Sequence, residues 1–441
     1  MLCVAQHRWT VCVLVVVILI ITPRGGSFAA TADPTRHIIL FVDGISLATQ
    51  EQLVTSLGGQ ILHELTLINA LAARFPLFNL ISILQSLLSN PNVLGVYDDS
   101  IAIIDQETSL TNELNTPQGT WFEWGQDNGH IHVPPIYNNG IRGSGVTVAV
   151  LDSGIDFTHP NLAANILGGF NAIAVLAGGS YYDDNGHGTH IAGIIAAIPS
   201  QGQGLIGTAS LAALVAVKVL DATGSGYLSD FINGLQWVHD RGVPDYGVRV
   251  LNMSLSFAQG SVPLQKVIHR LSQQGAIMVA SAGNCGQAGG GVDEDGGADG
   301  WGPAMACDLS HPAQNAVLYP AAYSEVMAVA ATDILNNVTY YSRYGPQVAV
   351  TAPGGAQSSV RLLSTVPGGG YAWGSGTSQA AAHASGVVAL ALQCRRSLSF
   401  NQVVAQLQAT AHFNYSYSSD QQGAGLIDAV QLIHALQPCI N

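Results

Sequence analysis

Hydrophobic and polar positions after residue 36 follow the periods of short strands and amphipathic helices. The pattern predicts strands and helices in the order strand, helix, strand, helix, strand, at 37–42, 49–57, 60–75, 80–89 and 93–104. This first part of the chain is therefore expected to form a small α+β unit of about 75 residues.

A polar stretch without periodicity, residues 105–119, predicts a linker after this unit. Beyond it, Gly-rich turns separate continuous apolar runs from helical stretches. The apolar runs predict strands at 146–151, 214–219, 248–253 and 277–281. The helical stretches lie at 187–197, 228–240 and 262–274. Fully apolar strands separated by helices are typical of a parallel sheet that is buried on both faces, so we expect a doubly wound, mostly parallel α/β fold.

The N-terminus has the pattern of a secretory signal. His7 and Arg8 precede an apolar run at 11–21, and small residues follow at 27–32, where a signal peptidase would cut. An uncleaved membrane anchor is the alternative, but about eleven apolar residues fall short of the roughly 20 that cross a bilayer. We expect residues 1–29 to be a signal peptide and the mature protein to be secreted and extracellular, without stable membrane association.

Composition narrows the range of partners. The 441 residues include 14 Lys and Arg against 28 Asp and Glu, a formal net charge of −14. Lys218 and Lys266 are the only lysines, so the chain has no basic stripe that could neutralise nucleic-acid phosphates. Nucleic acid is therefore not an expected partner, and a hydrophobic content of 48% excludes a disordered chain.

Cysteine usage indicates an oxidising compartment. Cys3 and Cys12 would leave with the signal, and an even number remains, which predicts disulfides. The remaining four are Cys285, Cys307, Cys394 and Cys439. Sequence proximity favours one bridge within the first two and another within the last two, although four cysteines allow three pairings. A zinc site is less expected because no cysteine pair has CxxC spacing.

Three segments supply an acid, a base and a nucleophile. Asp152 ends an apolar strand, His187 lies in a Gly-rich segment, and Ser378 opens a helical stretch among small residues. A serine hydroxyl attacks a carbonyl efficiently when an imidazole removes its proton and a carboxylate orients that imidazole. The chain order Asp, His, Ser is one of the known arrangements of such a triad.

Each of these residues also has a purely structural interpretation. Asp152 can end a strand or cap a helix, and Ser378 can cap the helix that it opens. His187 and His190 share a helical face and can together bind a metal, but no acidic third ligand lies in their segment. Catalysis is the favoured interpretation for Asp152, His187 and Ser378.

The three segments resemble the Asp, His and Ser signatures of subtilisin-like serine proteases, the subtilase family. The motif Ser281-Ala282-Gly283-Asn284 resembles the oxyanion-hole motif of that family. The resemblance covers nearly the whole chain. Residues 36–105 are similar to the inhibitory, chaperone-like propeptide, which has a ferredoxin-like α+β fold, and residues from about 120 to 441 are similar to the catalytic domain. It implies a signal peptide at 1–29, a propeptide at 30–105, a linker with the processing site at 106–119 and a peptidase domain at 120–441.

The resemblance also implies roles for single residues. Asp152, His187 and Ser378 would be the triad, Asn284 the oxyanion donor and His190 a buried structural histidine. An extended peptide would add as a strand to backbone edges of the protein. The implied substrate-binding residues are Gly224, Ser225, Gly226, Ser254, Leu255, Ser256, Ala282 and Gly283.

Several positions depart from the family pattern. Gln379 and Ala382 stand where Met and Pro are usual, and Ser256 stands where Gly is common. We expect these changes to affect the catalytic efficiency and the shape of the substrate pocket more than the reaction itself, because none of them removes a triad residue.

No cofactor is implied for the chemistry, and a structural calcium ion is possible. The family's calcium loop would correspond to residues 199–205, where Gln201 replaces the usual Asn and Asn161 stands where an acid is typical. Charge is missing at this loop, so calcium binding there is expected to be weak or absent. Four carboxylates in the insertion 285–310 are a second candidate for calcium, with a merely solvated loop as the alternative.

The expected function is that of a secreted, monomeric serine endopeptidase that is made as a self-processing zymogen. Its partners would be protein or peptide substrates and its own propeptide, acting as an intramolecular inhibitor. A catalytically dead binding protein is the first alternative, and the intact set of catalytic residues argues against it. A serine esterase of another fold is the second, but the residues around Ser378 do not form a GxSxG elbow.

Overall fold

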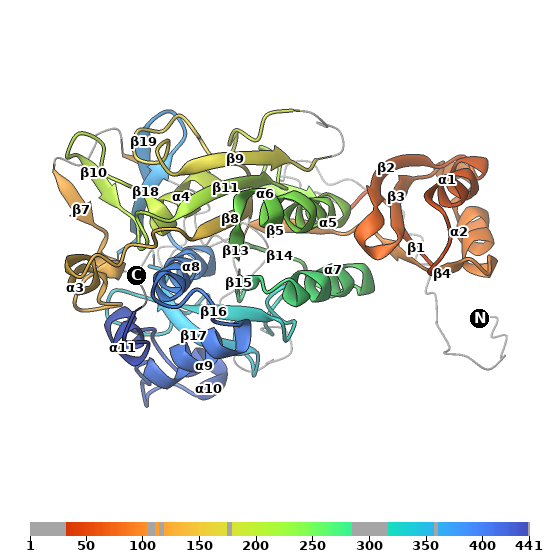
Figure 1. The fold of residues 1–441 in the computed structure, drawn as a ribbon. Coiled ribbons are helices and arrows are strands. Elements are labelled where there is room, and N and C mark those ends of the chain that lie inside the picture. The colour runs from red at the N-terminus through yellow and green to blue at the C-terminus, as the bar shows by residue number, and fades with distance from the viewer. Residues whose placement is uncertain are drawn as a thin grey trace, which may run out of the picture.

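The computed structural model of this chain describes residues 32–104, 111–113, 119–173, 179–284, 316–356 and 360–439. A small N-terminal unit, red to orange in Figure 1, stands beside a much larger unit, and strand β5 runs from the first into the second. The larger unit contains the residues to which the sequence assigns chemistry.

The N-terminal unit is a four-stranded antiparallel sheet with two helices. Its elements are β1 (Arg36–Phe41), α1 (Leu47–Ser56), β2 (Gln60–Leu65), β3 (Ala70–Arg74), α2 (Leu80–Ser89) and β4 (Val93–Asp98). The strand order β2-β3-β1-β4 is that of a ferredoxin-like split β-α-β fold. The prediction of one strand over 60–75 is wrong, because a 3-10 turn at Thr66–Ile68 and the left-handed Asn69, with φ 57°, reverse the chain there.

The predicted strand 93–104 is also divided. β4 ends at Asp98, and the chain resumes as β5 (Ile101–Ile104), which leaves the N-terminal sheet. β5 pairs with β12 (Ser225–Tyr227) on one side and β14 (Leu255–Ser256) on the other, both in the larger unit. The end of the N-terminal unit thus becomes the middle strand of a sheet in its neighbour.

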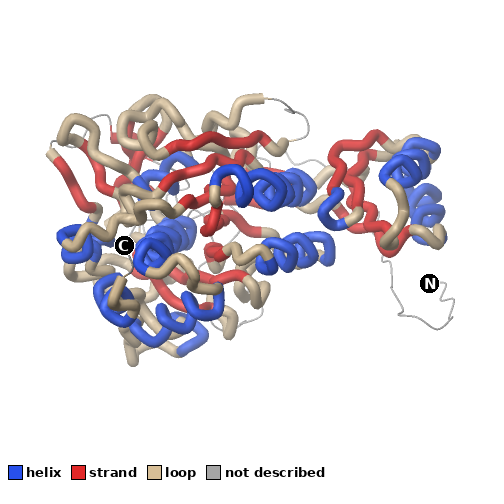
Figure 2. The backbone as a smooth tube through the Cα atoms, in the orientation of Figure 1, coloured by secondary structure: helices blue, strands red, loops and turns tan. Residues whose placement is uncertain are grey.

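The larger unit is built on a seven-stranded sheet in the order β17-β16-β15-β13-β8-β11-β9, in which all neighbours are parallel. The strands are β8 (Thr147–Asp152), β9 (Ile166–Asn171), β11 (Ala213–Lys218), β13 (Val248–Met253), β15 (Ile277–Ser281), β16 (Val326–Thr332) and β17 (Val348–Pro353). Their main covering helices are α4 (His187–Ala196), α5 (Leu228–Trp237), α7 (Val262–Gln273) and α8 (Thr377–Cys394). Helices cover both faces of the sheet in Figure 2, so the predicted doubly wound α/β fold is confirmed.

Alternate residues of the strands face two separate cores. Val148 and Val150 of β8 belong to the core under α4 and α8, while Ala149 and Leu151 belong to the core under α5 and α7. Because both faces of the central strands such as β8 are buried, these strands appear in the sequence as continuous apolar runs.

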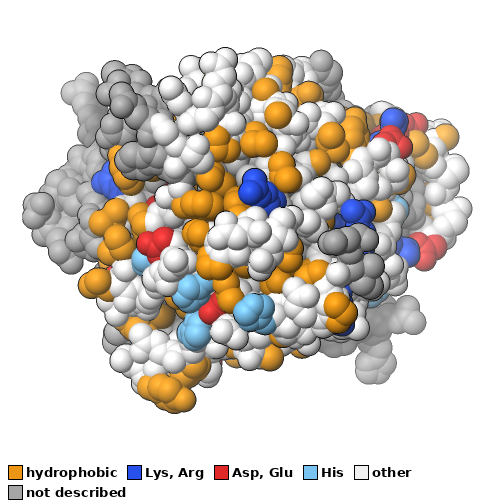
Figure 3. Space-filling model, turned by 60° about the vertical axis from the view of Figure 1, so that its left-hand side comes forward, with side chains coloured by type: hydrophobic (Ala, Val, Ile, Leu, Met, Phe, Trp, Pro, Cys, Tyr) orange, Lys and Arg blue, Asp and Glu red, His pale blue; other side chains and the backbone are white. Residues whose placement is uncertain are grey.

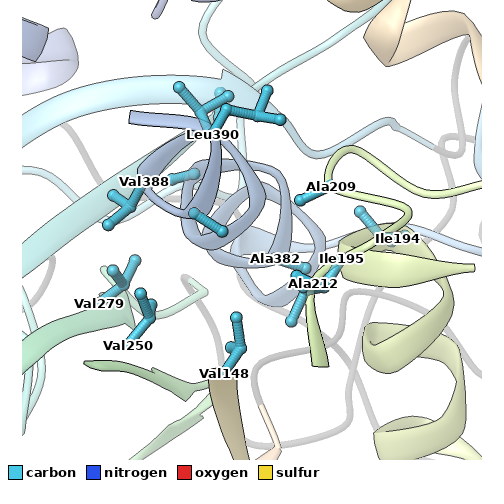
Figure 4. Close-up of a cluster of buried hydrophobic side chains, with 14 of the residues drawn as sticks. Val148, Ile194, Ile195, Ala209, Ala212, Val250, Val279, Ala382, Val388 and Leu390 are labelled. Atoms are coloured by element: carbon cyan, nitrogen blue, oxygen red, sulfur yellow. The ribbon is translucent and has the colours of Figure 1, made fainter. Parts of the chain in front are cut away.

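Helix α8 crosses the interior of the larger unit. In Figure 4, Val148, Val250 and Val279 from three strands lie beneath this helix, which carries Val388 and Leu390. A helix buried on all sides is apolar on all sides, which explains its weak amphipathicity. No helix in the described ranges has both the length and the hydropathy needed to span a membrane.

Smaller elements surround this framework. Two short sheets are formed by β10 (Gly204–Ile206) with β7 (Thr120–Phe122), and by β18 (Leu362–Val366), β19 (Gly370–Gly374) and β6 (Thr111–Glu113). The remaining helices are α3 (Val133–Asn138), α6 (Val243–Tyr246), α9 (Phe400–Thr410), α10 (Ser419–Gln422) and α11 (Ala429–Ala435). A disulfide joins Cys394 at the end of α8 to Cys439, as sequence proximity favours. Cys285 and Cys307 lie outside the described residues.

Buried charges hold the N-terminal sheet against the larger unit. The Arg36 guanidinium donates to Asp99 (Nε to Oδ2, 2.8 Å) and to Ser229 at the start of α5 (Nη2 to Oγ, 2.9 Å), and it lies over the Tyr227 ring. Asp99 also accepts the backbone N–H of Ser229 at 2.7 Å. Burial raises the pKa of Asp99, and the charge of Arg36 opposes this shift.

Replacing Arg36 by Met should therefore destabilise the chain strongly. The change leaves the Asp99 carboxylate buried without its cation, which typically costs about 3–5 kcal/mol. Urea unfolding in a Ser378→Ala background, which prevents self-digestion, measures this loss. Arg74→Met is the matched control, because Arg74 is 41% exposed and pairs with Asp33 at 3.1 Å, so its loss should cost less than about 1 kcal/mol. Equal losses for the two variants would contradict the assignment.

Candidate active site

Asp152 and His187 form a buried carboxylate–imidazole pair. Asp152 is the last residue of β8 and His187 is the first residue of α4, and both side chains are fully buried. The Nδ1 atom of His187 lies 2.8 Å from Oδ1 and 3.0 Å from Oδ2 of Asp152. A carboxylate at Nδ1 leaves Nε2 as the ring nitrogen that can take up a proton from a nucleophile.

The pair depends on an unusually close approach of two backbone segments. A Cβ atom at Gly188 would lie 2.1 Å from the carbonyl oxygen of Gly154 and 3.1 Å from Cβ of Asp152. Glycine at position 188 is therefore required for the first turn of α4 to reach the end of β8.

Asp183 organises the turn before His187 and was not identified from the sequence. Its Oδ1 accepts the backbone N–H groups of Asn185 and Gly186 at 3.0 and 2.8 Å, and its Oδ2 accepts the backbone N–H and the hydroxyl of Thr189 at 2.8 and 2.6 Å. It also accepts the hydroxyl of Ser153, next to Asp152, at 2.8 Å. The signal available in the sequence was an acid three residues before the turn glycine, Gly186.

Lys218 is a second residue near the site to which the sequence analysis assigned no role. It lies opposite Asp152 in the register of β11 and β8 and is almost fully buried. Its ammonium group donates to the carbonyl oxygens of Ser153 and Leu220 at 2.6 and 2.8 Å and to the Asp184 carboxylate at 2.6 Å. Lys218 thus fixes the backbone that follows Asp152 without contacting the Asp152 carboxylate directly.

Ser378 lies in the first turn of α8, after Gly376, whose φ is 155°. Its Oγ donates to the carbonyl oxygen of Ser254 at 3.2 Å, and the Ser254 hydroxyl donates to the carbonyl oxygen of Ser378 at 3.0 Å. Asn252 links the same elements by donating to the Ser254 hydroxyl and accepting from Ser385 of α8, both at 2.9 Å. Helix α4, which begins at His187, packs against α8, which carries Ser378 in its first turn.

Asn284 follows β15 and contacts the residue before the candidate nucleophile. Its Oδ1 accepts the backbone N–H and the hydroxyl of Thr377 at 3.1 and 2.8 Å. Its Nδ2 is buried and has no hydrogen-bond acceptor within the described part of the chain. Because Thr377 holds the oxygen side of the amide, the NH2 side is the available donor for a developing oxyanion.

The predicted substrate-binding segments flank an extended strand of the same chain. Ile103 of β5 pairs with both Ser225 and Ser256, and Ile104 pairs with Leu255. Ala102 pairs with Gly226, where a Cβ atom would lie 2.1 Å from the carbonyl oxygen of Val219. Gly224 is also at the groove, since a Cβ atom there would lie 3.1 Å from the Ile104 side chain.

Residues 101–104 thus occupy the groove between β12 and β14. Residues 105–110, which follow directly, lie outside the described residues. The strand enters antiparallel to both edges, which is how an extended peptide adds to a sheet.

Ala282 and Gly283 connect β15 to Asn284. Ala282 is buried. Its backbone N–H donates to the carbonyl oxygen of Val329, and its own carbonyl oxygen accepts the backbone N–H of Leu318. Gly283 has φ 97°, and a Cβ atom there would lie 2.9 Å from the side chains of Leu318 and Arg343. Neither residue contacts β5 through a paired backbone group, so their substrate role stays a prediction.

Polar side chains pack behind Ser378. Gln379 is fully buried, and neither its amide oxygen nor its nitrogen has a hydrogen-bond partner among the described residues. His383, one turn further along α8, lies 3.8 Å from the Glu123 carboxylate, and burial raises the pKa of Glu123 well above its usual value. The departure from the family pattern at Gln379 thus places an unsatisfied amide directly behind the candidate nucleophile.

The loop that resembles a calcium loop does not fit the ion. The Nδ2 of Asn161 donates to the carbonyl oxygens of Ile198 and Gln203 at 3.0 and 3.2 Å, and its Oδ1 accepts from Leu205 N at 3.3 Å and from the Tyr371 hydroxyl. Calcium requires six to eight oxygen ligands, carboxylates among them. Here an uncharged amide satisfies the carbonyl groups that would otherwise face a cation. The acidic insertion 285–310 lies outside the described residues.

Known proteins resemble this chain over most of its length. A sequence profile of the Subtilase family matches residues 143–425. A thermostable alkaline protease of Halalkalibacterium halodurans is 36% identical over 332 residues, 75% of this chain and 77% of the relative. An alkaline protease of Shouchella clausii is 36% identical over 353 residues, 80% of this chain and 79% of the relative. Subtilisin E of Bacillus subtilis is 32% identical over 396 residues, 89% of both chains.

Two buried histidines next to the site should make the fold sensitive to acid. Burial lowers the pKa of His190, which lies 3.1 Å from the Ala372 carbonyl oxygen, to about 3, and lowers the pKa of His383 to about 4. Between these values and about 6.5 the unfolded chain binds the protons that the folded chain does not, so each histidine lowers stability as the pH falls. Each contributes a slope of about 1.4 kcal/mol per pH unit.

The test compares urea unfolding of Ser378→Ala with and without His190→Gln from pH 4.5 to 6.5. The added substitution should reduce the pH slope by about one proton, or about 1.4 kcal/mol per unit. Glu123 and Asp99, whose pKa values are raised by burial, act in the opposite direction but are present in both proteins. His269→Gln, at an exposed histidine, should leave the slope unchanged. An unchanged slope in His190→Gln would show that His190 is not the source.

Proposed function

The chain belongs to the subtilase family and is a subtilisin-type serine endopeptidase, and we propose that Asp152, His187 and Ser378 are its catalytic triad. The observation that carries this proposal is the buried contact between the Asp152 carboxylate and Nδ1 of His187. That contact sits at the carboxyl edge of a parallel sheet, where such folds place their active sites. Subtilases need no cofactor for this chemistry.

In the proposed mechanism, the Ser378 Oγ bonds to the carbonyl carbon of the scissile peptide while Nε2 of His187 accepts the hydroxyl proton. The tetrahedral intermediate collapses, the C–N bond breaks, and the leaving amine takes the proton from His187. Water then repeats the sequence on the acyl-enzyme and releases Ser378. Asp152 stays ionised throughout and stabilises the imidazolium.

Asn284 is proposed to stabilise the oxyanion. Its NH2 group is oriented by Thr377, and the backbone N–H of Ser378 at the start of α8 supplies a second donor at the positive end of the helix dipole. Both donors are in place before substrate arrives, so they need no reorganisation in the transition state.

Asn284→Asp tests this role with the least disturbance. The new carboxylate keeps an oxygen to accept from Thr377 but replaces the donor, so kcat should fall by at least about 10²–10³ while KM changes little. The lower bound is carried over from the corresponding amide of a subtilisin. Steady-state kinetics on a peptide substrate measure the split between kcat and KM. Ser378→Ala sets the background, and an Asn284→Asp enzyme with normal kcat would rule out the proposed donor.

The N-terminal unit is proposed to be an inhibitory propeptide. Three features of the described residues support this: the ferredoxin-like topology, the buried charge contacts of Arg36 with α5, and strand β5 lying in the groove. While β5 pairs with β12 and β14, no other peptide can use the same backbone groups. The unit also presents a preformed sheet to α5 and α7, so it can template the slow pairing of a parallel sheet.

We also propose that the protein is secreted and that it cleaves its own precursor. Residues 1–29, proposed as the signal peptide, precede the propeptide at 30–105, the linker at 106–119 and the peptidase domain at 120–441. The protein is proposed to act as a monomer on protein or peptide substrates.

The register of β5 predicts where the chain cuts itself. Ile104 pairs with Leu255, which is next to Ser254, and the Ser254 carbonyl accepts the hydroxyl of Ser378. The first bond cleaved should therefore follow Ile104 closely, at the beginning of the 105–119 linker. N-terminal sequencing and intact mass of the mature wild-type protein locate this bond, and Ser378→Ala should accumulate as the uncut precursor. Cleavage of Ser378→Ala at the same bond in purified form would contradict self-processing.

A further inference from the structure

Two histidines and one aspartate converge on the surface of the larger unit, away from the proposed triad. His132 directly precedes α3, His412 follows α9, and Asp428 precedes α11. One ligand atom from each residue lies within 4.8 Å of the other two. Figure 3 shows histidine side chains, in pale blue, gathered around a red carboxylate on the side of the molecule that carries α3 and α11.

Both imidazoles approach the same carboxylate oxygen. Nε2 of His412 lies 2.6 Å from Oδ2 of Asp428, and Nδ1 of His132 lies 3.1 Å from that atom. Nδ1 of His132 is nevertheless buried without a hydrogen bond to any described residue. A buried ring nitrogen that lies close to a carboxylate without bonding to it is suited to share a cation with that carboxylate.

The three residues are held in place by their backbones. Oδ1 of Asp428 caps α11 by accepting Gln431 N at 2.9 Å, which turns Oδ2 toward the histidines. His412 exchanges two backbone hydrogen bonds with Leu426, at 2.8 and 2.9 Å, close to Asp428 in the chain. The residue after Asp428 donates to the residue before His132, Ala429 N to Ile131 O at 3.0 Å. Each ligand segment is thus tied to another by backbone hydrogen bonds next to the cluster.

We propose that His132, His412 and Asp428 bind one zinc ion. Two imidazole nitrogens and one carboxylate oxygen are ligands that zinc prefers. Bonds of about 2.0–2.2 Å in a tetrahedral site set the ligand atoms about 3.3 Å apart. The two nitrogen–oxygen separations, 2.6 Å from His412 and 3.1 Å from His132 to Asp428, need to widen by less than about 1 Å to reach that spacing.

The site leaves one coordination position for water and has an entry path, since the His412 side chain is 56% exposed. The ion joins three segments that are distant in the sequence: the chain before α3, the chain after α9 and the start of α11. Its role is to fasten the C-terminal helices to the start of the peptidase domain. This role is independent of the proposed catalytic mechanism, and none of its ligands belongs to the triad.

Zinc titration of the full chain carrying Ser378→Ala tests the proposal without relying on proteolysis. Isothermal titration calorimetry should show one zinc ion per chain, and Co2+ added in place of zinc should give the visible absorption bands of a tetrahedral site. Zinc should also raise the Tm. In His412→Ala and in Asp428→Asn, affinity should fall by at least about 10- to 100-fold and the rise in Tm should disappear.

The variants separate ligation from folding. Asp428→Asn keeps a side chain that caps a helix as well as Asp does, so α11 should form normally while the anionic ligand is lost. His269→Ala, at an exposed histidine outside the cluster, should bind zinc like the parent. The proposal is overturned if the parent binds no zinc at one equivalent, or if His412→Ala and Asp428→Asn bind it with the parent's stoichiometry and affinity.

Discussion

The buried contact between Asp152 and His187 is the constraint on which the rest of the site depends. It requires α4 to begin within van der Waals distance of the end of β8, which Gly188 alone permits at that position. The Asp152 carboxylate also accepts the backbone N–H of Ser153 at 2.7 Å. Asp183 accepts backbone N–H groups of the turn before His187, and Lys218 donates to the carbonyl oxygen of Ser153. A carboxylate held this way orients the imidazole without having to be reordered during the reaction.

A second feature of the structure is that strand β5 is held in the groove by backbone pairing with β12 and β14. β12 and β14 each present one edge to the same space. The chain's own residues 101–104 lie in this space and pair with both edges. Such pairing depends on main-chain N–H and C=O groups and is therefore tolerant of sequence. The proposed propeptide and a peptide substrate would therefore use the same backbone groups. The buried Arg36 contacts fasten the N-terminal unit, which β5 follows, to the start of α5.

The family resemblance implies a calcium ion at the loop 199–205, but the side chains of this protein favour a metal ion at a different place. At the loop 199–205, the Asn161 amide already satisfies the carbonyl groups that calcium would coordinate. At the proposed zinc site, His132 and His412 both lie close to one carboxylate oxygen of Asp428, and Nδ1 of His132 forms no hydrogen bond with a described residue. An amide replaces a hard cation in the first case, whereas imidazole ligands favour a borderline metal in the second. The proposed zinc ion would therefore stabilise the C-terminal helices of the larger unit.

The sequence by itself determined the parallel α/β class and singled out Asp152, His187, Ser378 and Asn284 as candidate site residues, because apolar runs and local motifs extend over only a few residues. It did not determine where single strands break: the turn at Asn69 and the departure of β5 after Asp98 interrupt apolar runs that are continuous in the sequence. β9 and β17, at the two edges of the main sheet, and β16, next to β17, were likewise not predicted. Asp183, Lys218 and the cluster of His132, His412 and Asp428 became visible only in the tertiary structure. Their roles depend on distances between segments far apart in the chain, and no local period or motif encodes such distances.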